Sequence, residues 1–138
     1  MSLDLERLMA VWDEPGNAEA FVRLYADPVI LNGVATPPAA LAAMARGLHA
    51  AISEQSREIL DVFTAGDRVA VAFVLRGRHT GTLGSRLGPM PASGAVLEAS
   101  VIDLFTVADG KITEVRAVSD ELGLLLGAGL TAAINRRD

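Results

Sequence analysis

Three ionisable residues fall on one face of a predicted β-hairpin in the last third of the chain. The turn is indicated by Asp109-Gly110, which lies between two alternating apolar runs and suits a type I′ turn. Counting outward from a two-residue loop predicts Asp103 opposite Arg116, with Asp120 pointing to the same face. Carboxylates in apolar surroundings can exchange protons near neutral pH, and a guanidinium can bind an anionic oxygen. The pattern predicts a pocket.

Each of these residues also has a structural interpretation. Asp120 precedes a short apolar helix and would cap its free backbone N–H groups, a role that is compatible with catalysis. Asp103 and Arg116 would form an ion pair on the pocket floor, where Arg116 could still bind a substrate oxygen. The sequence leaves both alternatives open.

A second group of candidates comes from neighbouring elements. His79 shares strand parity with Phe73 on the predicted inner face, and Phe105 lies on the inner face of the hairpin. His79 fits either a pocket acid or hydrogen-bond donor, or a buried histidine bonded to a backbone carbonyl. Tyr25 is expected in the core, where its hydroxyl could reach the pocket wall, and Asn32 is expected as a turn residue and substrate contact.

The elements that must position these residues follow from hydrophobic periodicity and turn signals. Apolar residues at spacings of three and four predict helices at 4–14, 17–25 and 36–52, with 36 as the cap. Strands are predicted at 29–32, 56–64 and 68–80, followed by the hairpin and a final helix. This order predicts an α+β fold in which helices cover one face of a curved sheet and the pocket lies between them.

The other face of the predicted sheet is unusually apolar for a surface that meets water. On the hairpin it carries Ile102, Leu104, Val115 and Ala117, and the preceding strand adds residues 70, 72 and 74. An apolar outer face usually has a partner that covers it. We therefore expect a homodimer that packs through this outer sheet face.

Bulk properties exclude several classes of protein. The 138 residues contain no repeat or linker, so we expect a single domain over residues 1–138. The net charge of −5 argues against nucleic acid or an anionic membrane as a partner. The absence of cysteine excludes disulfides and thiolate sites, and two histidines leave little scope for a metal centre. No signal peptide or membrane span is indicated, so a cytoplasmic protein is expected.

Four stretches of the chain match motifs of a known family: residues 75–81 (LRGRHTG), 102–105 (IDLF), 109–112 (DGKI) and 120–125 (DELGLL). With these motifs the chain resembles the SnoaL-like polyketide cyclases. They belong to the cone-shaped nuclear-transport-factor-like superfamily, which also contains the ketosteroid isomerases. The resemblance extends from about Leu8 to Gly129 and implies a curved antiparallel or mixed sheet wrapped on N-terminal helices.

The resemblance also implies a reaction, an intramolecular aldol closure without metal or cofactor in which Asp120 is the acid/base. A carboxylate takes a proton α to one carbonyl, and the enolate attacks a second carbonyl held nearby. Many relatives have histidine and tryptophan where this chain has Val115 and Arg116. Ketosteroid isomerases have a basic aspartate where Asn32 lies, and their protonated aspartate falls near Asp103. Because Asp103 is predicted to face Arg116 and stay ionised, isomerase chemistry of that kind is not expected.

Three functions remain open from the sequence. The first is a cofactor-independent enzyme acting on a small hydrophobic carbonyl compound, with Asp120 as base and His79 as acid or oxyanion donor. In this hypothesis Asp103 and Arg116 form the polar floor of the pocket. The second is a non-catalytic module that binds a small hydrophobic ligand, which the missing histidine–tryptophan pair favours. The third is an assembly protein that acts through its apolar sheet face.

Overall fold

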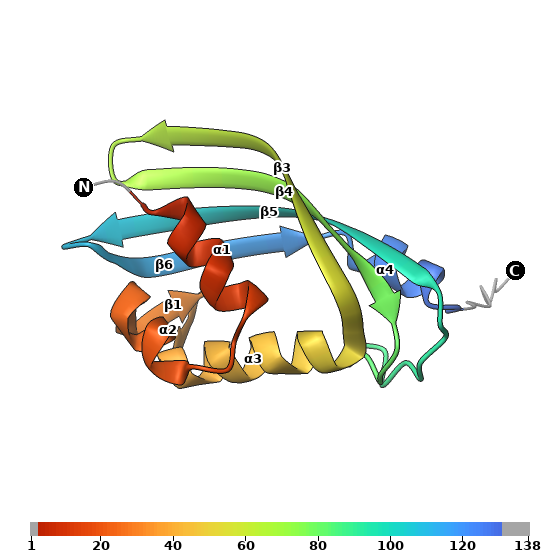
Figure 1. Cartoon of the computed structure of the whole chain (residues 1–138). Coiled ribbons are helices and arrows are strands. Elements are labelled where there is room, and N and C mark those ends of the chain that lie inside the picture. Colours follow the sequence, from red (N-terminus) through yellow and green to blue (C-terminus); the bar gives the residue numbers. More distant parts are fainter. Residues whose placement is uncertain (1–2, 131–138) are drawn as a thin grey trace, which may run out of the picture.

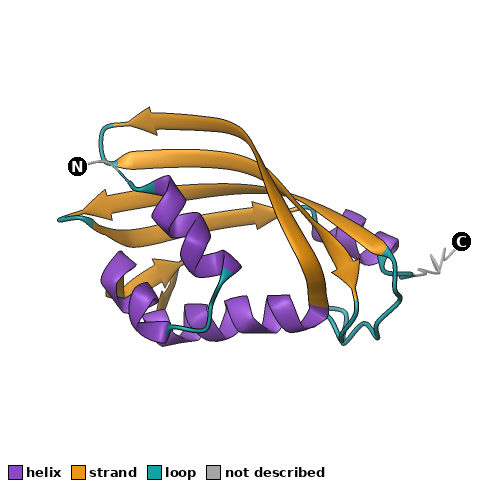
Figure 2. Ribbon diagram, in the orientation of Figure 1, coloured by secondary structure: helices purple, strands orange, loops and turns teal. Residues whose placement is uncertain are grey.

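The computed structural model describes residues 3–130, which form four helices and one six-stranded sheet (Figures 1 and 2). The helices are α1 (Leu5–Asp13), α2 (Ala18–Leu24), α3 (Pro38–Ala51) and α4 (Glu121–Gly127). The strands are β1 (Tyr25–Leu31), β2 (Val34–Thr36), β3 (Ile52–Ala65), β4 (Arg68–His79), β5 (Val96–Ala108) and β6 (Lys111–Ser119). The predicted α+β fold is confirmed.

The sheet is mixed, with the strand order β2-β1-β6-β5-β4-β3. Only β1 and β6 pair in parallel, and the other neighbours are antiparallel. Figure 1 shows the long strands bending around α1, α2 and α3, which lie on the concave side, while α4 lies at the far end of β5 and β6. The three N-terminal helices therefore cover the concave face of the sheet.

The helix starts follow local capping chemistry. The Asp4 side chain accepts a hydrogen bond from the backbone N–H of Arg7, and Asn17 caps α2 in the same way, as predicted. The predicted cap at Thr36 is wrong, because this residue ends β2 and the cap of α3 is Pro37. Among the described residues no helix combines the length and the apolar character needed to cross a membrane.

The β5–β6 hairpin has the predicted turn. Asp109 and Gly110 have positive φ angles of 52° and 77°, as a type I′ turn requires. Ala108 pairs with Lys111 directly beside the turn, so the strands start in the register that the sequence indicated. The Asp-Gly signal was therefore sufficient to locate the turn.

Beyond the turn, the register differs from the prediction. The pairing shifts by one residue between Thr106 and Val107, where a bulge lengthens β6 relative to β5. Asp103 consequently pairs with Ala117, and the predicted pairing of Asp103 with Arg116 is wrong. Because successive side chains alternate between the faces of a sheet, this shift moves Arg116 to the outer face.

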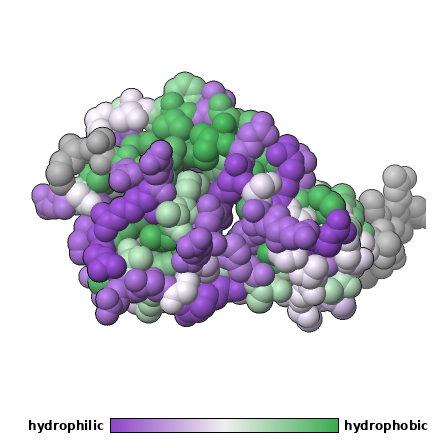
Figure 3. Space-filling view, in the orientation of Figure 1, coloured by the Kyte–Doolittle hydropathy of each residue, from purple (hydrophilic) through white to green (hydrophobic). Residues whose placement is uncertain are grey.

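The same bulge changes which residues form the outer face. Val115 and Ala117 were predicted there, but both line the inner cavity. Ile102 pairs with Val118 on the outer face, and these residues are 58% and 71% exposed. Figure 3 shows hydrophobic side chains gathered along the strands at its upper edge, where β3 carries the exposed residues Ile59, Leu60, Val62 and Phe63. The homodimer through the outer face stays a prediction.

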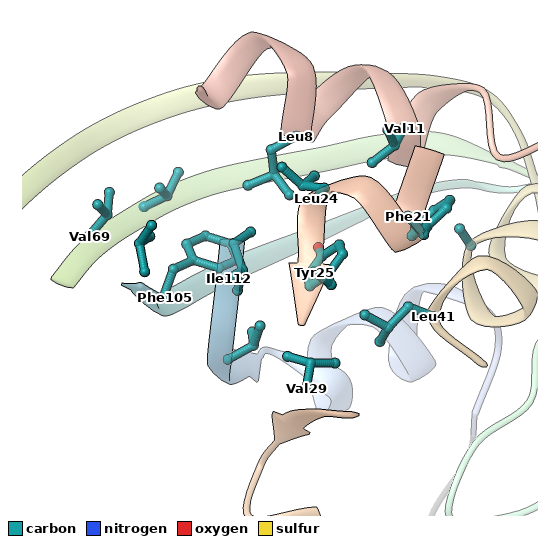
Figure 4. Close-up of a cluster of buried hydrophobic side chains, with 14 of the residues drawn as sticks. Leu8, Val11, Phe21, Leu24, Tyr25, Val29, Leu41, Val69, Phe105 and Ile112 are labelled. Carbon is teal, nitrogen blue, oxygen red and sulfur yellow. The ribbon is translucent and has the colours of Figure 1, made fainter. Parts of the chain in front are cut away.

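The main core fills the space between α1, α2 and the inner face of the sheet (Figure 4). Its largest fully buried side chains include Phe21, Tyr25 and Leu8, and the ring of Phe21 stacks on that of Tyr25 at 6.2 Å. A smaller cluster around Ile52 and Leu97 packs under α4. These clusters hold the helices against the sheet.

Candidate functional site

A cavity of about 420 Å³ lies between α1, α3 and the inner face of the sheet. Its wall is mainly apolar and includes the predicted residues Phe73 and Phe105. The polar side chains in the wall are those of Tyr25, Asn32, Arg57, Asp103 and Ser119. A small number of polar groups in an apolar cavity is typical of a small-molecule site.

Tyr25 presents a hydroxyl proton to the cavity. The indole N–H of Trp12 donates to the Tyr25 hydroxyl oxygen at 2.9 Å. Because an indole N–H is only a donor, the Tyr25 oxygen must be the acceptor in this bond, and its own proton remains available to another group. Burial raises the pKa of Tyr25 and the nearby Asp103 adds to this effect, so the hydroxyl stays protonated.

Asp103 is the carboxylate of the cavity. It lies on β5 between Val71 of β4 and Ala117 of β6, and all three side chains point inward. Burial raises the pKa of Asp103 to about 6, and the positive charge of Arg57 partly opposes this rise. Within residues 3–130, no ion pair is formed by its carboxylate. Asp103 can therefore take up and release a proton close to neutral pH.

Arg57 enters the same cavity from β3. Its guanidinium forms an ion pair with Asp13, the last residue of α1, and lies 5.7 Å from the centre of the Phe73 ring. The side chain is 9% exposed, and its buried Nε has no hydrogen-bond partner among the described residues. Burial lowers the pKa of Arg57, while Asp13 and Asp103 act in the opposite direction. A charged donor is thus held in the cavity wall.

Asn32 lines the cavity in a fixed orientation. It has a positive φ of 47°, a conformation that asparagine tolerates in turns. Its side-chain carbonyl accepts the backbone N–H of Ala117 at 2.8 Å. The two N–H donors of the Asn32 amide group remain available to a ligand.

Two other predicted site residues lie away from this cavity wall. Arg116 is on the outer face, where its guanidinium pairs with Glu114 at 3.7 Å. Asp120 is exposed and caps α4 by accepting the backbone N–H of Gly123 at 2.9 Å. A Cβ at residue 123 would approach the Asp120 carboxylate to 2.3 Å, so the Asp120 side chain would have to shift if residue 123 were not glycine. The structure does not bring Asp120 together with Asp103 in the cavity wall.

His79 points inward, as its strand parity predicted, but it lies at the end of β4 rather than in the cavity wall. The side chain is fully buried. Its Nδ1 accepts the backbone N–H of Ser93 at 3.2 Å, and its backbone bonds to Ala95 and Gly94. These contacts anchor the loop that follows β4, and the ring bonds to a backbone N–H rather than to the backbone carbonyl of the structural alternative. The catalytic roles of His79 and Asp120 stay predictions.

Sequence reasoning missed Arg57 and the contact between Trp12 and Tyr25. Arg57 occurs in a strand with Glu54, Glu58 and Asp61 nearby, a composition typical of an exposed edge. The only available signal was parity, because residue 57 shares its face with the apolar Ile59. A single charged residue on that face was too weak a signal to predict a site.

Solved structures with known names share this fold. TsrD from Streptomyces laurentii is 23% identical, with a TM-score of 0.78 and coverage of 91% of each chain. IdmH from Streptomyces antibioticus is 20% identical, with a TM-score of 0.70 and coverage of 91% of this chain and 98% of that one. A SnoaL-like polyketide cyclase from Agrobacterium tumefaciens is 16% identical, with a TM-score of 0.71 and the same coverages, 91% and 98%. At these identities the similarity shows the fold alone.

The family is established by a different comparison. No curated protein matches the chain. The model of the SnoaL-like polyketide cyclase family matches residues 3–126, which include every described strand and most of α4. The chain belongs to the SnoaL-like polyketide cyclase family.

Proposed function

We propose that the protein is a cofactor-independent acid/base enzyme that acts on a hydrophobic carbonyl compound and uses Asp103 to move the proton. The observation that carries this proposal is the position of Asp103, a carboxylate in a mainly apolar cavity that forms no ion pair with any described residue. A carboxylate with a pKa of about 6 is a usable base at neutral pH, and its conjugate acid returns the proton readily.

The proposed reaction begins with transfer of a proton from the carbon α to a carbonyl to an oxygen of Asp103. The electrons of the broken C–H bond form an enolate, and the Tyr25 hydroxyl donates a hydrogen bond to its oxygen. For ring closure, the enolate carbon bonds to a second carbonyl carbon of the same substrate. The second carbonyl oxygen then takes a proton, which Asp103 can supply. For isomerisation, Asp103 returns the proton to a different carbon.

Isomerisation is also open to this cavity, because Arg116 does not lie opposite Asp103. In the predicted register, the charge of Arg116 would have kept the Asp103 carboxylate ionised. Asp103 instead pairs with Ala117, and burial raises its pKa to about 6. The cavity therefore allows both protonation states of Asp103, and ring closure and isomerisation share the same first step.

A binding module is the second candidate function. Val115 lines the cavity at a position where many relatives have histidine, so that part of the wall contributes no titratable group. The apolar wall alone would suffice to hold a small hydrophobic ligand. In this case the ligand would be recovered unaltered, and no proton of the ligand would exchange.

The experiment incubates the protein in heavy water at neutral pH with β-keto esters and polycyclic ketones and follows exchange at the acidic carbon by proton NMR. Asp103→Asn and Asp120→Asn are matched variants that each remove one carboxylate. The proposal predicts that exchange is lost in Asp103→Asn and retained in Asp120→Asn. The opposite pattern would assign the base to Asp120, and exchange at the background rate in the native protein would favour the binding module.

A further inference from the structure

The proposed acid/base reaction gives no task to the guanidinium of Arg57, although this charged group lies in the cavity wall. Burying an arginine side chain to 9% exposure costs free energy unless its charge and its donors are satisfied. Asp13 satisfies the charge from the α1 side, where its own side chain is 49% exposed. The buried Nε–H of Arg57 has no acceptor among the described residues. This donor is available to a ligand in the cavity.

The register of the sheet shows where the guanidinium lies. Arg57 pairs with Leu75, while Asp103 pairs with Val71, and the inward-facing Phe73 lies between these two positions on β4. The guanidinium of Arg57 lies over the Phe73 ring and not beside Leu75, the residue that pairs with Arg57. The Arg57 side chain therefore extends along the sheet toward the position of Asp103. No ion pair joins Arg57 to Asp103 within the described part of the chain. The two groups thus line the same cavity, and Arg57 acts on Asp103 through its charge rather than through an ion pair between described residues.

The ligand group that fits this end must be rich in acceptors. Arg57 and Tyr25 both offer N–H or O–H protons, and Asn32 adds its amide N–H groups from elsewhere in the wall. A carboxylate presents two acceptor oxygens in a plane, and arginine is the side chain best suited to bind it. We propose that Arg57 binds a carboxylate group of the substrate, which makes the substrate a hydrophobic keto acid rather than a neutral ketone. The keto group of this substrate rests on the proposed function, whereas the carboxylate site does not.

The charges around Asp103 add a consequence. The pKa of Asp103 is influenced by the positive charge of Arg57. The pKa of Arg57 is in turn influenced by Asp13, which pairs with it from α1, and by Tyr25. Asp13 already balances the charge of Arg57, so an incoming carboxylate meets the negative charge of ionised Asp103. Binding of the carboxylate therefore favours the protonated form of Asp103. Above pH 6, where Asp103 is mostly ionised in the free protein, Asp103 takes up a proton when the carboxylate binds. A one-unit rise in the pKa of Asp103 on binding would weaken the affinity about tenfold between pH 5 and pH 8.

The test compares 2-naphthoate with its methyl ester, two probes that differ only in the carboxylate. Trp12 is the single tryptophan of the chain and lines the cavity, so its fluorescence reports binding directly. Native protein should bind the carboxylate at least about tenfold more tightly than the ester at pH 6. Arg57→Lys keeps a charge beside Asp13 but loses the Nε–H donor, and it should abolish the preference of the cavity for the carboxylate over the ester. Arg68→Lys, the same change at an exposed position of β4, should have no effect.

A third variant separates the charge effect from the donor effect. In Asp103→Asn the affinity for 2-naphthoate should no longer depend on pH between 5 and 8. Equal binding of the two probes, an unchanged preference in Arg57→Lys, or no response of Trp12 to either probe would overturn the inference. Naphthoate binding that depends on Arg57, without any proton exchange on carbonyl compounds, would support the carboxylate site and reject the proposed reaction. Proton exchange on carbonyl compounds without a preference for the carboxylate probe would support the proposed reaction and reject the carboxylate site.

Discussion

Replacing Asp103 by asparagine should stabilise the fold, and the gain should grow with pH. Burial raises the pKa of Asp103 from 3.8 to about 6 in the folded protein. Below pH 3.8 both the folded and the unfolded chain carry a neutral Asp103, and ionisation has no effect on stability. As the pH rises, the unfolded chain ionises first, so the free energy of unfolding falls until the folded form has also ionised above pH 6.

The size of this effect follows from the two pKa values. Each tenfold change in an ionisation equilibrium corresponds to about 1.4 kcal/mol, so an ionised Asp103 costs about 2 to 3 kcal/mol of folding free energy at pH 8. Asparagine has nearly the same shape and stays neutral. We expect Asp103→Asn to be about 0.5 kcal/mol more stable than the native protein at pH 4, and about 2 to 3 kcal/mol more stable at pH 8.

Urea denaturation at several pH values between 4 and 8 measures this difference. Asp61→Asn is the matched control, because it makes the same change at an exposed position of β3. Its stability relative to the native protein should stay constant over the range. A difference between Asp103→Asn and native protein that does not grow with pH would refute the claim that Asp103 is a carboxylate held at a cost. Such a cost is common at sites that are selected for function rather than stability.

Three further predictions concern other parts of the molecule. Tyr25→Phe leaves the buried N–H of Trp12 without its acceptor, so the free energy of unfolding should fall by about 1 to 3 kcal/mol and proton exchange should slow, as denaturation and NMR would measure. An unchanged exchange rate would remove Tyr25 from the reaction. Asp120→Ala removes the cap of α4 and should cost about 1 kcal/mol in denaturation experiments, while carbonyl compounds still exchange their protons. Ile102→Lys combined with Val118→Lys places charges on the outer sheet face and should convert a homodimer to a monomer in sedimentation experiments. A native protein that sediments as a monomer would contradict the predicted dimer.

Much of the fold was predictable because its signals are local. Apolar spacing predicted the three N-terminal helices, and the Asp109-Gly110 pair predicted the turn that joins β5 to β6. The boundary between α3 and β3 was misplaced, because Ile52 continues the apolar helical stripe although it is the first strand residue. Boundaries of this kind depend on tertiary contacts that spacing does not contain.

The site was harder to predict, because a single bulge decides which side chains enter it. Nothing in the residues next to Thr106 indicates an extra residue in the partner strand, since bulges are set by how two strands fit together. The shift brings Val115 and Ala117 into the cavity and takes Arg116 out of it. Asp103 was predicted in the pocket and lies there. The bulge is in β6, so it does not change the alternation of side chains along β5.

Arg57 shows a different limit. Its strand parity was readable, but its place in the cavity depends on contacts with Asp13 of α1 and Phe73 of β4. These contacts join residues that are far apart in the sequence, and no local pattern links them. Charged residues on an edge strand usually meet water, so the default interpretation was reasonable and wrong for this side chain.

The central claim is that Asp103 moves the proton, and the pH dependence of proton exchange tests it most directly. The exchange rate of a β-keto ester in heavy water, measured from pH 4.5 to pH 8, should rise through a midpoint near 6 as Asp103 becomes a base, and then level off. Asp103→Asn should show only the background rate at every pH, whereas Asp120→Asn should reproduce the native curve. A native curve without this midpoint, or one that persists in Asp103→Asn, would contradict the account.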